Sequence, residues 1–511
     1  MNIYEIISFA IYLFAVLVVG LYFFFKVKTK NEKDYFLGGK NMNGWVSALS
    51  AGASDMSAWV LMGLPGSIFL YGLGQVWISI GLFIGTICAW IFVAPRLRRF
   101  ALKANDSITI PQFLTNRFKS KNSFLGITCA VIFTLGYCLY SASSVYACGQ
   151  LANTLFPSLS QELAMIISAI VIVGYTLLGG FNAVCWTDFI QGMLMLVALM
   201  FVPIITLIIY KSSGGLGTVI TSENYYNFLS SGKFDWGSIS TIITGLGWGL
   251  GYFGMPHILV RYMSIKSEKE MKKSQIIGST WTFLILLMAT IVALIGHEYL
   301  GNTLDDGSKN LVFVTIVRNI FSEGPLALIG GLLISAIVAA SMSTADSQLL
   351  LSSSSFSSDI YKTAINRNAS NKKMMFVGRI TVLVVTIIAL IIALLVKKFN
   401  LGGIMEIVSA AWSIFGAAFG PVILLALYWK RFNYKGACAG IISGFVFSIL
   451  WMVLFNFEYY GFKSLIFNTS IYEIVPGFIV GLLVSIIVSL KTAAPSKEAI
   501  SLFNEAKSLN V

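Results

Sequence analysis

Long apolar runs separated by short polar stretches are the dominant pattern along this chain. A helix that crosses a membrane needs about 20 mainly apolar residues. Thirteen segments of that kind can be marked, which predicts an all-α polytopic membrane protein. They are residues 3–27, 43–72, 74–100, 123–156, 161–180, 185–210, 237–264, 274–300, 324–355, 375–396, 402–429, 435–457 and 471–490.

The second segment differs from a plain membrane helix at its centre. Within Trp45–Tyr71, WVSALSAGASDMSAWVLMGLPGSIFLY, small and hydroxyl residues surround the carboxylate of Asp55. A charge at that depth costs roughly 3 kcal/mol or more, so it usually serves a function and faces a partner or a water-filled cavity. We expect Gly52 to let the helix open, which would free carbonyl groups for a hard cation such as Na⁺. The alternative is a packing face of small residues, with Asp55 bonded to a neighbour.

The segment at residues 237–264 is interrupted in a similar way. Glycine stands at nearly every second position from Gly245 to Gly254, and Pro256 follows. Each glycine weakens a helix by about 1 kcal/mol relative to alanine, and proline removes one more backbone hydrogen bond. Because a stripe of packing glycines would repeat every four residues, the pattern favours unwinding.

Aromatic residues of two segments suit a pocket for a small solute. Trp248, Tyr252 and Pro256 recur at i, i+4 and i+8, and they would share one face if the local turn is helical. Tyr140 lies in another span dotted with polar residues. Aromatic walls and a phenol suit a compact apolar ring that bears a charged group. The alternative is that these side chains simply pack in the core.

Oxygen donors for a cation occur in the segment 324–355. Ser343 and Thr344 are neighbours, and Ala340 precedes them by three and four residues, so the Ala340 carbonyl and the two hydroxyls share one helix face. Na⁺ prefers such oxygen ligands. Opposite an opened helix with free carbonyls at Ala53 and Met56, they would form a site of five oxygens. Alternatively, the hydroxyls bond only to their own helix.

Three further acids lie in or at the ends of spans. Asp188 stands at the inner end of the segment 185–210, and its loop contains no basic residue. It is a candidate ligand for a second cation or a proton, or else a solvated acid at a helix start, where the helix dipole favours it. Asp346 and Glu406 are candidates for a gate or an ion path.

The composition agrees with a membrane transporter. Of the 511 residues 57% are hydrophobic and 11% are charged, whereas a soluble domain has about 25% charged residues. With the N-terminus outside, 28 of the 35 lysines and arginines fall in loops on the inner side, which predicts that the C-terminus lies inside. The six cysteines show no CxxC spacing and are expected to be free thiols. No phosphate-binding loop, HExxH or GxSxG motif occurs, so we expect no enzyme and an ion gradient as the energy source.

Several long motifs resemble the sodium:solute symporter family over residues 3 to 490. They include YTLLGGFNAVCWTD (Tyr175–Asp188), FGAAFGPVILLALYWKR (Phe415–Arg431) and LLISAIVAASMSTADSQLL (Leu332–Leu350), and the similarity is strongest to members that carry proline. The resemblance implies Na⁺-driven uptake of L-proline across the cytoplasmic membrane of a bacterium. It implies Na⁺ as the coupling ion, no organic cofactor, no nucleic-acid partner and no obligate protein partner.

The resemblance also implies a leucine-transporter-like core of two inverted five-helix repeats, with one span before it and two after it. The expected parts are a peripheral helix and cytoplasmic loop, the first repeat, an extracellular loop, the second repeat, two peripheral helices and a cytoplasmic tail. Their residues are 1–42, 43–210, 211–236, 237–430, 431–490 and 491–511.

The resemblance carries three sets of residues over to this chain. The implied sodium ligands are Ala53, Met56, Ala340, Ser343 and Thr344. The residues implied in ion coupling are Asp55 and Asp188. The implied substrate-binding residues are Ser57, Tyr140, Trp248, Tyr252 and Pro256.

Two other functions remain open at this stage. The same machinery could carry another amino acid, a sugar or a vitamin, and competition with unlabelled solutes separates these from proline. A membrane sensor or a channel is the other class. A sensor normally carries a soluble output domain, for which no loop is long enough, and a channel conducts without saturation.

Overall fold

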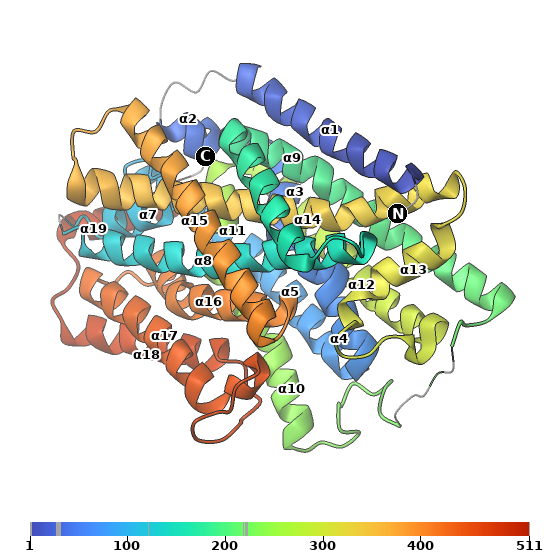
Figure 1. Cartoon of the computed structure of the whole chain (residues 1–511). Helices are drawn as coiled ribbons and strands as arrows, with labels where there is room; N and C mark the ends of the chain where they lie inside the picture. The colour runs from blue at the N-terminus through green and yellow to red at the C-terminus, as the bar shows by residue number, and fades with distance from the viewer. Residues whose placement is uncertain (1–2, 27–31, 121, 218, 220–222, 510–511) are drawn as a thin grey trace.

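The computed structural model describes residues 3–26, 32–120, 122–217, 219 and 223–509 (Figure 1). Within these ranges the chain is helical, and its one β-bridge pairs Met42 with Ile265. Residues 27–31, where the first expected span ends and its loop begins, and the last two residues of the expected tail lie outside the described ranges.

Ten helices in the described part of the chain are long and apolar enough to cross a membrane, which confirms the prediction of a multi-span all-α protein. The other three expected segments, 43–72, 161–180 and 237–264, contain shorter helical pieces. The ten are Ile3–Tyr22, Leu73–Lys103, Phe124–Leu155, Gly180–Ser213, Glu268–Thr303, Leu326–Ile365, Asn371–Phe399, Ile404–Tyr428, Tyr434–Phe455 and Ile474–Lys491.

The α-helices follow one another in chain order, with 3-10 or π-helical turns between some of them. They are α1 (Ile3–Lys26), α2 (Glu32–Leu37), α3 (Gly44–Asp55), α4 (Leu64–Tyr71), α5 (Val76–Cys88), α6 (Ala94–Lys103), α7 (Ile110–Arg117), α8 (Phe124–Leu155), α9 (Gln161–Ser213), α10 (Trp236–Gly247), α11 (Pro256–Ser264), α12 (Glu268–Leu300), α13 (Val312–Phe321), α14 (Leu326–Ser354), α15 (Asn371–Phe399), α16 (Ile404–Tyr428), α17 (Tyr434–Phe455), α18 (Ile474–Lys491) and α19 (Lys497–Ser508).

The most buried spans lie at the centre of the bundle. The apolar stretches of α14 and α16 are 72% and 83% buried, whereas that of α1 is 28% buried. α1 packs along α9 and α14 at one edge, and α17 and α18 pack against α16 at the opposite edge (Figure 1). α3 lies inside, against α9, α12 and α14. The helix that carries Asp55 is therefore surrounded by protein rather than by lipid.

The expected break in the second segment is present, although Gly52 does not cause it. α3 continues through Gly52 and ends at Asp55, and Met56 leaves the helical region with φ −84° and ψ 79°. A π-helical turn at Trp59–Gly63 precedes α4. Gly52 is needed for close packing instead, because a Cβ atom there would lie 2.4 Å from the Trp281 ring. The prediction about Gly52 was wrong because sequence alone does not distinguish a glycine that opens a helix from one that accommodates a neighbouring ring.

The predicted unwinding of the segment 237–264 is confirmed. α10 gives way to a 3-10 helix at Trp248–Phe253, and Met255 is extended before α11 begins. The 3-10 turn means that the i, i+4, i+8 pattern does not place its aromatic residues on one α-helical face. Gly249 allows close backbone contact, since a Cβ atom there would lie 2.3 Å from the Gly81 carbonyl oxygen.

The C-terminal tail forms α19, an amphipathic helix. Its buried face, which includes Ala499 and Phe503, packs on α6 and α7. Arg117, which is fully buried, donates hydrogen bonds to the carbonyls of Ala499 and Ala426. The tail is thus attached to α6 directly and, through Arg117 of α7, to the end of α16.

Candidate cation and substrate site

An oxygen cluster lies where the end of α3 meets the middle of α14. The carbonyl of Ala53 accepts hydrogen bonds from Ser343 Oγ at 2.8 Å and Thr344 Oγ1 at 3.4 Å. Ser343 Oγ also contacts the Ala340 carbonyl oxygen at 3.1 Å. Four of the five oxygens expected to bind Na⁺ are therefore neighbours, although Ala53 precedes the other three residues by about 290 positions.

The fifth expected ligand, Met56, stands at the break itself. It is fully buried, and its N–H closes the last turn of α3 on the Gly52 carbonyl at 2.8 Å. Its carbonyl cannot take part in a regular helix because the chain turns away after Asp55. All five donors are hard oxygen atoms, the type that alkali and alkaline-earth cations prefer. The composition of the cluster therefore fits Na⁺.

Asp55 lies beside this cluster and is only 1% exposed. Its Oδ2 accepts a hydrogen bond of 2.6 Å from the hydroxyl of Tyr252, and its Oδ1 has no hydrogen-bond partner among the described residues. Since a buried carboxylate oxygen without a partner is costly, one side of Asp55 is well placed to interact with a cation or a bound solute. The packing alternative, in which a neighbour satisfies Asp55, holds for only one of its two oxygens.

Three of the five predicted substrate-binding residues meet at the break. The carbonyl of Asp55 accepts hydrogen bonds from Tyr140 Oη at 3.0 Å, from Trp59 Nε1 at 3.1 Å and from the Ser57 N–H at 3.0 Å. Tyr252 reaches the same residue through its carboxylate. Tyr140 of α8 and Tyr252 of the 3-10 helix thus meet Asp55 and Ser57 at the break, whereas Pro256 begins α11 and is buried there.

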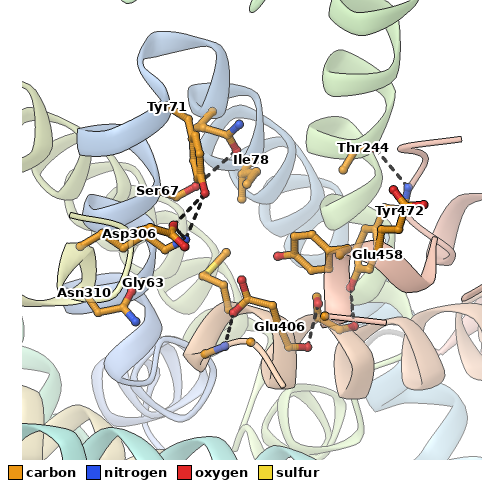
Figure 2. A pocket seen from close by; sticks show the side chains of 18 of the residues that line it. Gly63, Ser67, Tyr71, Ile78, Thr244, Asp306, Asn310, Glu406, Glu458 and Tyr472 are labelled. Carbon is orange, nitrogen blue, oxygen red and sulfur yellow. Dashed lines mark hydrogen bonds and ion pairs between the residues drawn. The ribbon is translucent and has the colours of Figure 1, made fainter. Parts of the chain in front are cut away.

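A cavity of about 690 Å³ lies on one side of this centre. Figure 2 shows Glu406 at its base, with Tyr71 and Asp306 on one side and Thr244 and Tyr472 on the other. Its walls come from α4, α10, the start of α16 and the loops at 306–310 and 456–472. Of the ten residues implied in sodium and substrate binding, only Trp248 lines this cavity.

Trp248 lies between the cavity and the Asp55 centre. Its ring centroid is 6.3 Å from those of both Trp59 and Trp412, and 5.0 Å from that of Tyr472. Trp412 donates a hydrogen bond of 2.8 Å to the Trp248 carbonyl and also packs edge-on against Tyr252. A continuous group of aromatic rings therefore connects the floor of the cavity with the tyrosine that binds Asp55.

Asp188 does have a basic partner, contrary to the expectation from its loop. Its Oδ2 lies 2.9 Å from Arg261 Nη2 and 2.6 Å from Ser50 Oγ, and both ionic side chains are almost completely buried. Arg261 also bonds to Ser347 and to the His257 carbonyl. The alternative of a solvated acid is wrong because a helix distant in sequence supplies the guanidinium group.

The two remaining acids have different surroundings. Asp346 is fully buried, with its Oδ1 3.4 Å from Ser347 Oγ and its Oδ2 unpartnered among the described residues. Glu406 lines the cavity, and its Oε2 accepts the Gly403 N–H at 2.7 Å, which caps α16. Only Glu406 is thus positioned to contact solutes in the cavity.

Sequence reasoning missed several residues of this region. Trp59, Trp412 and Tyr472 are not distinguished by sequence pattern from other membrane aromatics. Ser50 and Arg261 carried a signal, since each lies in one of the two interrupted segments. Arg261 is one of the 28 lysines and arginines expected in inner loops, but the structure buries it inside α11.

Known proteins are similar to this chain over nearly its whole length. The profile of the sodium:solute symporter family matches residues 35–444. The chain is 42% identical to the high-affinity proline transporter PutP of Bacillus subtilis, over 96% of this chain and 98% of that protein. It is 39% identical to the osmoregulated proline transporter OpuE of the same organism, over 100% and 99%. It is 38% identical to the sodium/proline symporter of Escherichia coli, over 98% and 96%.

Solved structures show a similar fold. A Na⁺-coupled sialic acid symporter, solved in a substrate-bound outward-open state, superimposes with a TM-score of 0.76 at 21% identity, over 97% of this chain and 99% of that one. MhsT in complex with L-phenylalanine gives a TM-score of 0.52 at 12% identity, over 88% and 97%. At these identities the likeness concerns the fold alone.

Proposed function

The chain belongs to the sodium:solute symporter family, and we propose that it carries L-proline into the cell together with Na⁺. The single observation that carries this proposal is the oxygen cluster between Ala53 and the hydroxyls of Ser343 and Thr344, adjacent to a half-unpartnered Asp55. The proteins cited above, which match this chain over nearly its whole length, are named as proline transporters or symporters.

In this proposal Na⁺ binds between the broken helix and α14. The carbonyls of Ala53, Met56 and Ala340 and the hydroxyls of Ser343 and Thr344 replace its hydration shell. Asp55 supplies a negative charge immediately beside these oxygens, which favours the cation electrostatically. Because the same residue is bonded to Tyr140 and Tyr252, a cation at the cluster alters the groups that face the solute. That shared residue couples the two binding events.

Proline binds on the aromatic side of the break. Ser57, Tyr140, Trp248, Tyr252 and Pro256 form its pocket, in which the pyrrolidine ring packs against apolar faces and polar groups hold the charged end. Broken helices in transporters offer unpaired backbone N–H groups to a carboxylate. In this chain the N–H groups of Met56 and Ser57 are bonded to the carbonyls of Gly52 and Asp55, so they would exchange these bonds for the solute carboxylate.

The proposed architecture has thirteen spans, with two inverted five-helix repeats at residues 43–210 and 237–430. The helix at 1–42 and the pair at 431–490 are peripheral, 211–236 is an outer loop and 491–511 is an inner tail. With the N-terminus outside, the cavity opens outward, since its walls at 306–310 and 456–472 belong to outer loops. Closing that cavity and opening the opposite side would give alternating access.

We also propose that Asp188 takes part in coupling because it links three helices, and not because it is a ligand exposed to the cavity. Its carboxylate connects Ser50 of α3, Arg261 of α11 and Ser347 of α14. These are the helices that carry both breaks and the oxygen cluster. A change in the cation site can therefore be transmitted to the second broken segment through one polar cluster.

Competition for uptake tests the choice of solute. Excess unlabelled proline is expected to abolish uptake of radiolabelled proline, whereas other amino acids, sugars and vitamins at the same excess leave it largely intact. If proline fails to compete while another solute succeeds, the transporter carries that solute and the assignment of proline is wrong.

Thr344→Ala is expected to weaken Na⁺ affinity about tenfold or more, because one oxygen ligand of a cation is lost. Proline affinity measured at saturating Na⁺ should change much less. The measurement is a titration of uptake with Na⁺ and, separately, with proline. Ser341→Ala is the matched control, since the Ser341 hydroxyl donates to the Ile337 carbonyl of its own helix at 3.0 Å. The opposite order of effects would remove Thr344 from the ion site.

Trp248→Ala is expected to raise the KM for proline about tenfold, since a buried aromatic wall is lost, and to leave the Na⁺ dependence unchanged. Uptake kinetics and a detergent thermal melt should be measured on the same preparation. A lower melting temperature with an unaltered KM would show that Trp248 only packs in the core.

A further inference from the structure

The loop between α17 and α18 lines part of the cavity, although these two helices lie at the edge of the bundle (Figures 1 and 2). Asn456, Glu458, Ser470 and Tyr472 of this loop line the cavity. The residue at its end, Tyr472, is 3% exposed and directly contacts the Trp248 ring. A peripheral hairpin therefore contributes a side chain to the wall that separates the cavity from Asp55.

Two hydrogen-bonded junctions fix this end of the loop. Thr244 of α10 donates through Oγ1 to the Ser470 carbonyl at 2.9 Å and accepts the Tyr472 N–H at 3.1 Å (Figure 2). The Tyr472 hydroxyl donates to the Ser409 carbonyl of α16 at 2.7 Å. The Tyr472 ring is thus held by its backbone on one broken segment and by its hydroxyl on a central helix.

A buried acid secures the loop internally. Glu473 is fully buried, and its two carboxylate oxygens accept hydrogen bonds from Tyr460 Oη at 2.6 Å and Asn456 Nδ2 at 2.9 Å. Tyr460 Oη in turn lies 3.1 Å from Ser409 Oγ. These bonds join the start and the end of the loop to α16, so the position of Tyr472 does not depend on the hydroxyl alone.

The Tyr472 ring supports one side of Trp248 while Trp412 supports another. The Trp248 and Tyr472 centroids are 5.0 Å apart with an interplanar angle of 31°, and the Trp248 and Trp412 centroids are 6.3 Å apart. Side chains flanked in this way have few accessible rotamers, and a preorganised wall improves binding because less ordering is required. Removing Tyr472 would leave Trp248 unsupported on the side of the cavity.

We propose that Tyr472 is a positioning residue for substrate binding, which holds the Trp248 indole in the orientation that forms the outer wall of the proline pocket. This inference rests on the proposed function, because it takes proline as the solute and Trp248 as part of its pocket. It assigns a role in solute affinity to the hairpin outside the proposed two-repeat core.

Tyr472→Ala tests the inference in proteoliposomes that receive a Na⁺ gradient. The KM for proline is expected to rise about five- to tenfold, as the loss of one aromatic pair implies, while the maximal rate and the Na⁺ dependence stay within about twofold. Tyr472→Phe keeps the ring and is expected to restore most of the proline affinity. Phe467→Ala is the matched control, because Phe467 belongs to the same loop, is 60% exposed and packs on Phe455 instead.

The possible outcomes separate this inference from the proposed function. A normal KM in Tyr472→Ala, with active wild-type protein, overturns the inference and leaves the function intact. So does a lower maximal rate with an unchanged KM, or a Tyr472→Phe variant as impaired as Tyr472→Ala. If the wild-type protein takes up no proline under a Na⁺ gradient, the proposed function fails and the inference fails with it.

Discussion

Asp55→Asn is expected to raise the Na⁺ concentration for half-maximal proline uptake by one to two orders of magnitude. The change keeps the side-chain shape and an oxygen acceptor for Tyr252, but it removes the negative charge beside the oxygen cluster. A unit charge within about 8 Å contributes ~2 kcal/mol at an effective dielectric constant of about 20, which is a factor of more than ten in affinity. The loss of cation binding thus comes from charge rather than from misfolding.

The measurement is a Na⁺ titration of proline uptake by wild-type and variant protein. Asp235→Asn is the matched control, because Asp235 caps α10 by accepting the Ser238 N–H and asparagine caps helices equally well. It should leave the titration unchanged. If Asp55→Asn behaves like this control, the carboxylate takes no part in sodium coupling and the mechanism proposed for the break is wrong.

Arg261→Met is expected to destabilise the protein by about 3–5 kcal/mol, because it leaves the buried Asp188 without its counter-charge. Arg261 and Asp188 are 1% and 0% exposed at the side chain, so water cannot replace the missing partner. A thermal melt in detergent measures the effect as a lower unfolding temperature. Arg318→Met is the control, since Arg318 is half-buried and donates to the Thr154 carbonyl.

Combining Arg261→Met with Asp188→Asn should recover much of the lost stability, because no uncompensated charge then remains in the interior. Uptake by the double variant reports on coupling separately from folding. If Arg261→Met alone melts like the wild-type protein, the pair contributes little to stability, and the proposed link between the two broken helices loses its physical basis.

The features that are local in sequence were predictable. Apolar run length indicates an all-α membrane protein, and the cluster of small residues around Asp55 indicates an interrupted helix, as observed at Met56. The hydroxyls of Ser343 and Thr344 were identified from their shared helix face, and they meet Ala53 as expected. Each of these signals depends on spacing within a single segment.

The features that depend on tertiary packing were not predictable. The Asp188 and Arg261 pair joins residues 73 positions apart, and the Tyr472 and Trp248 contact joins a loop to a distant 3-10 helix. Gly52 illustrates the same limit, because its requirement for glycine comes from the Trp281 ring and not from its own helix. Periodicity reports which face of an element is apolar, but it does not report which partner that face meets.

The measurement that tests the central claim most directly is uptake of radiolabelled proline by proteoliposomes that contain the purified protein. With Na⁺ high outside and low inside, proline is expected to accumulate above its external concentration, and accumulation should vanish when Na⁺ is equal on both sides or replaced by K⁺. Equal accumulation with and without the imposed Na⁺ gradient would contradict the account, because the oxygen cluster beside Asp55 would then not couple sodium to the solute.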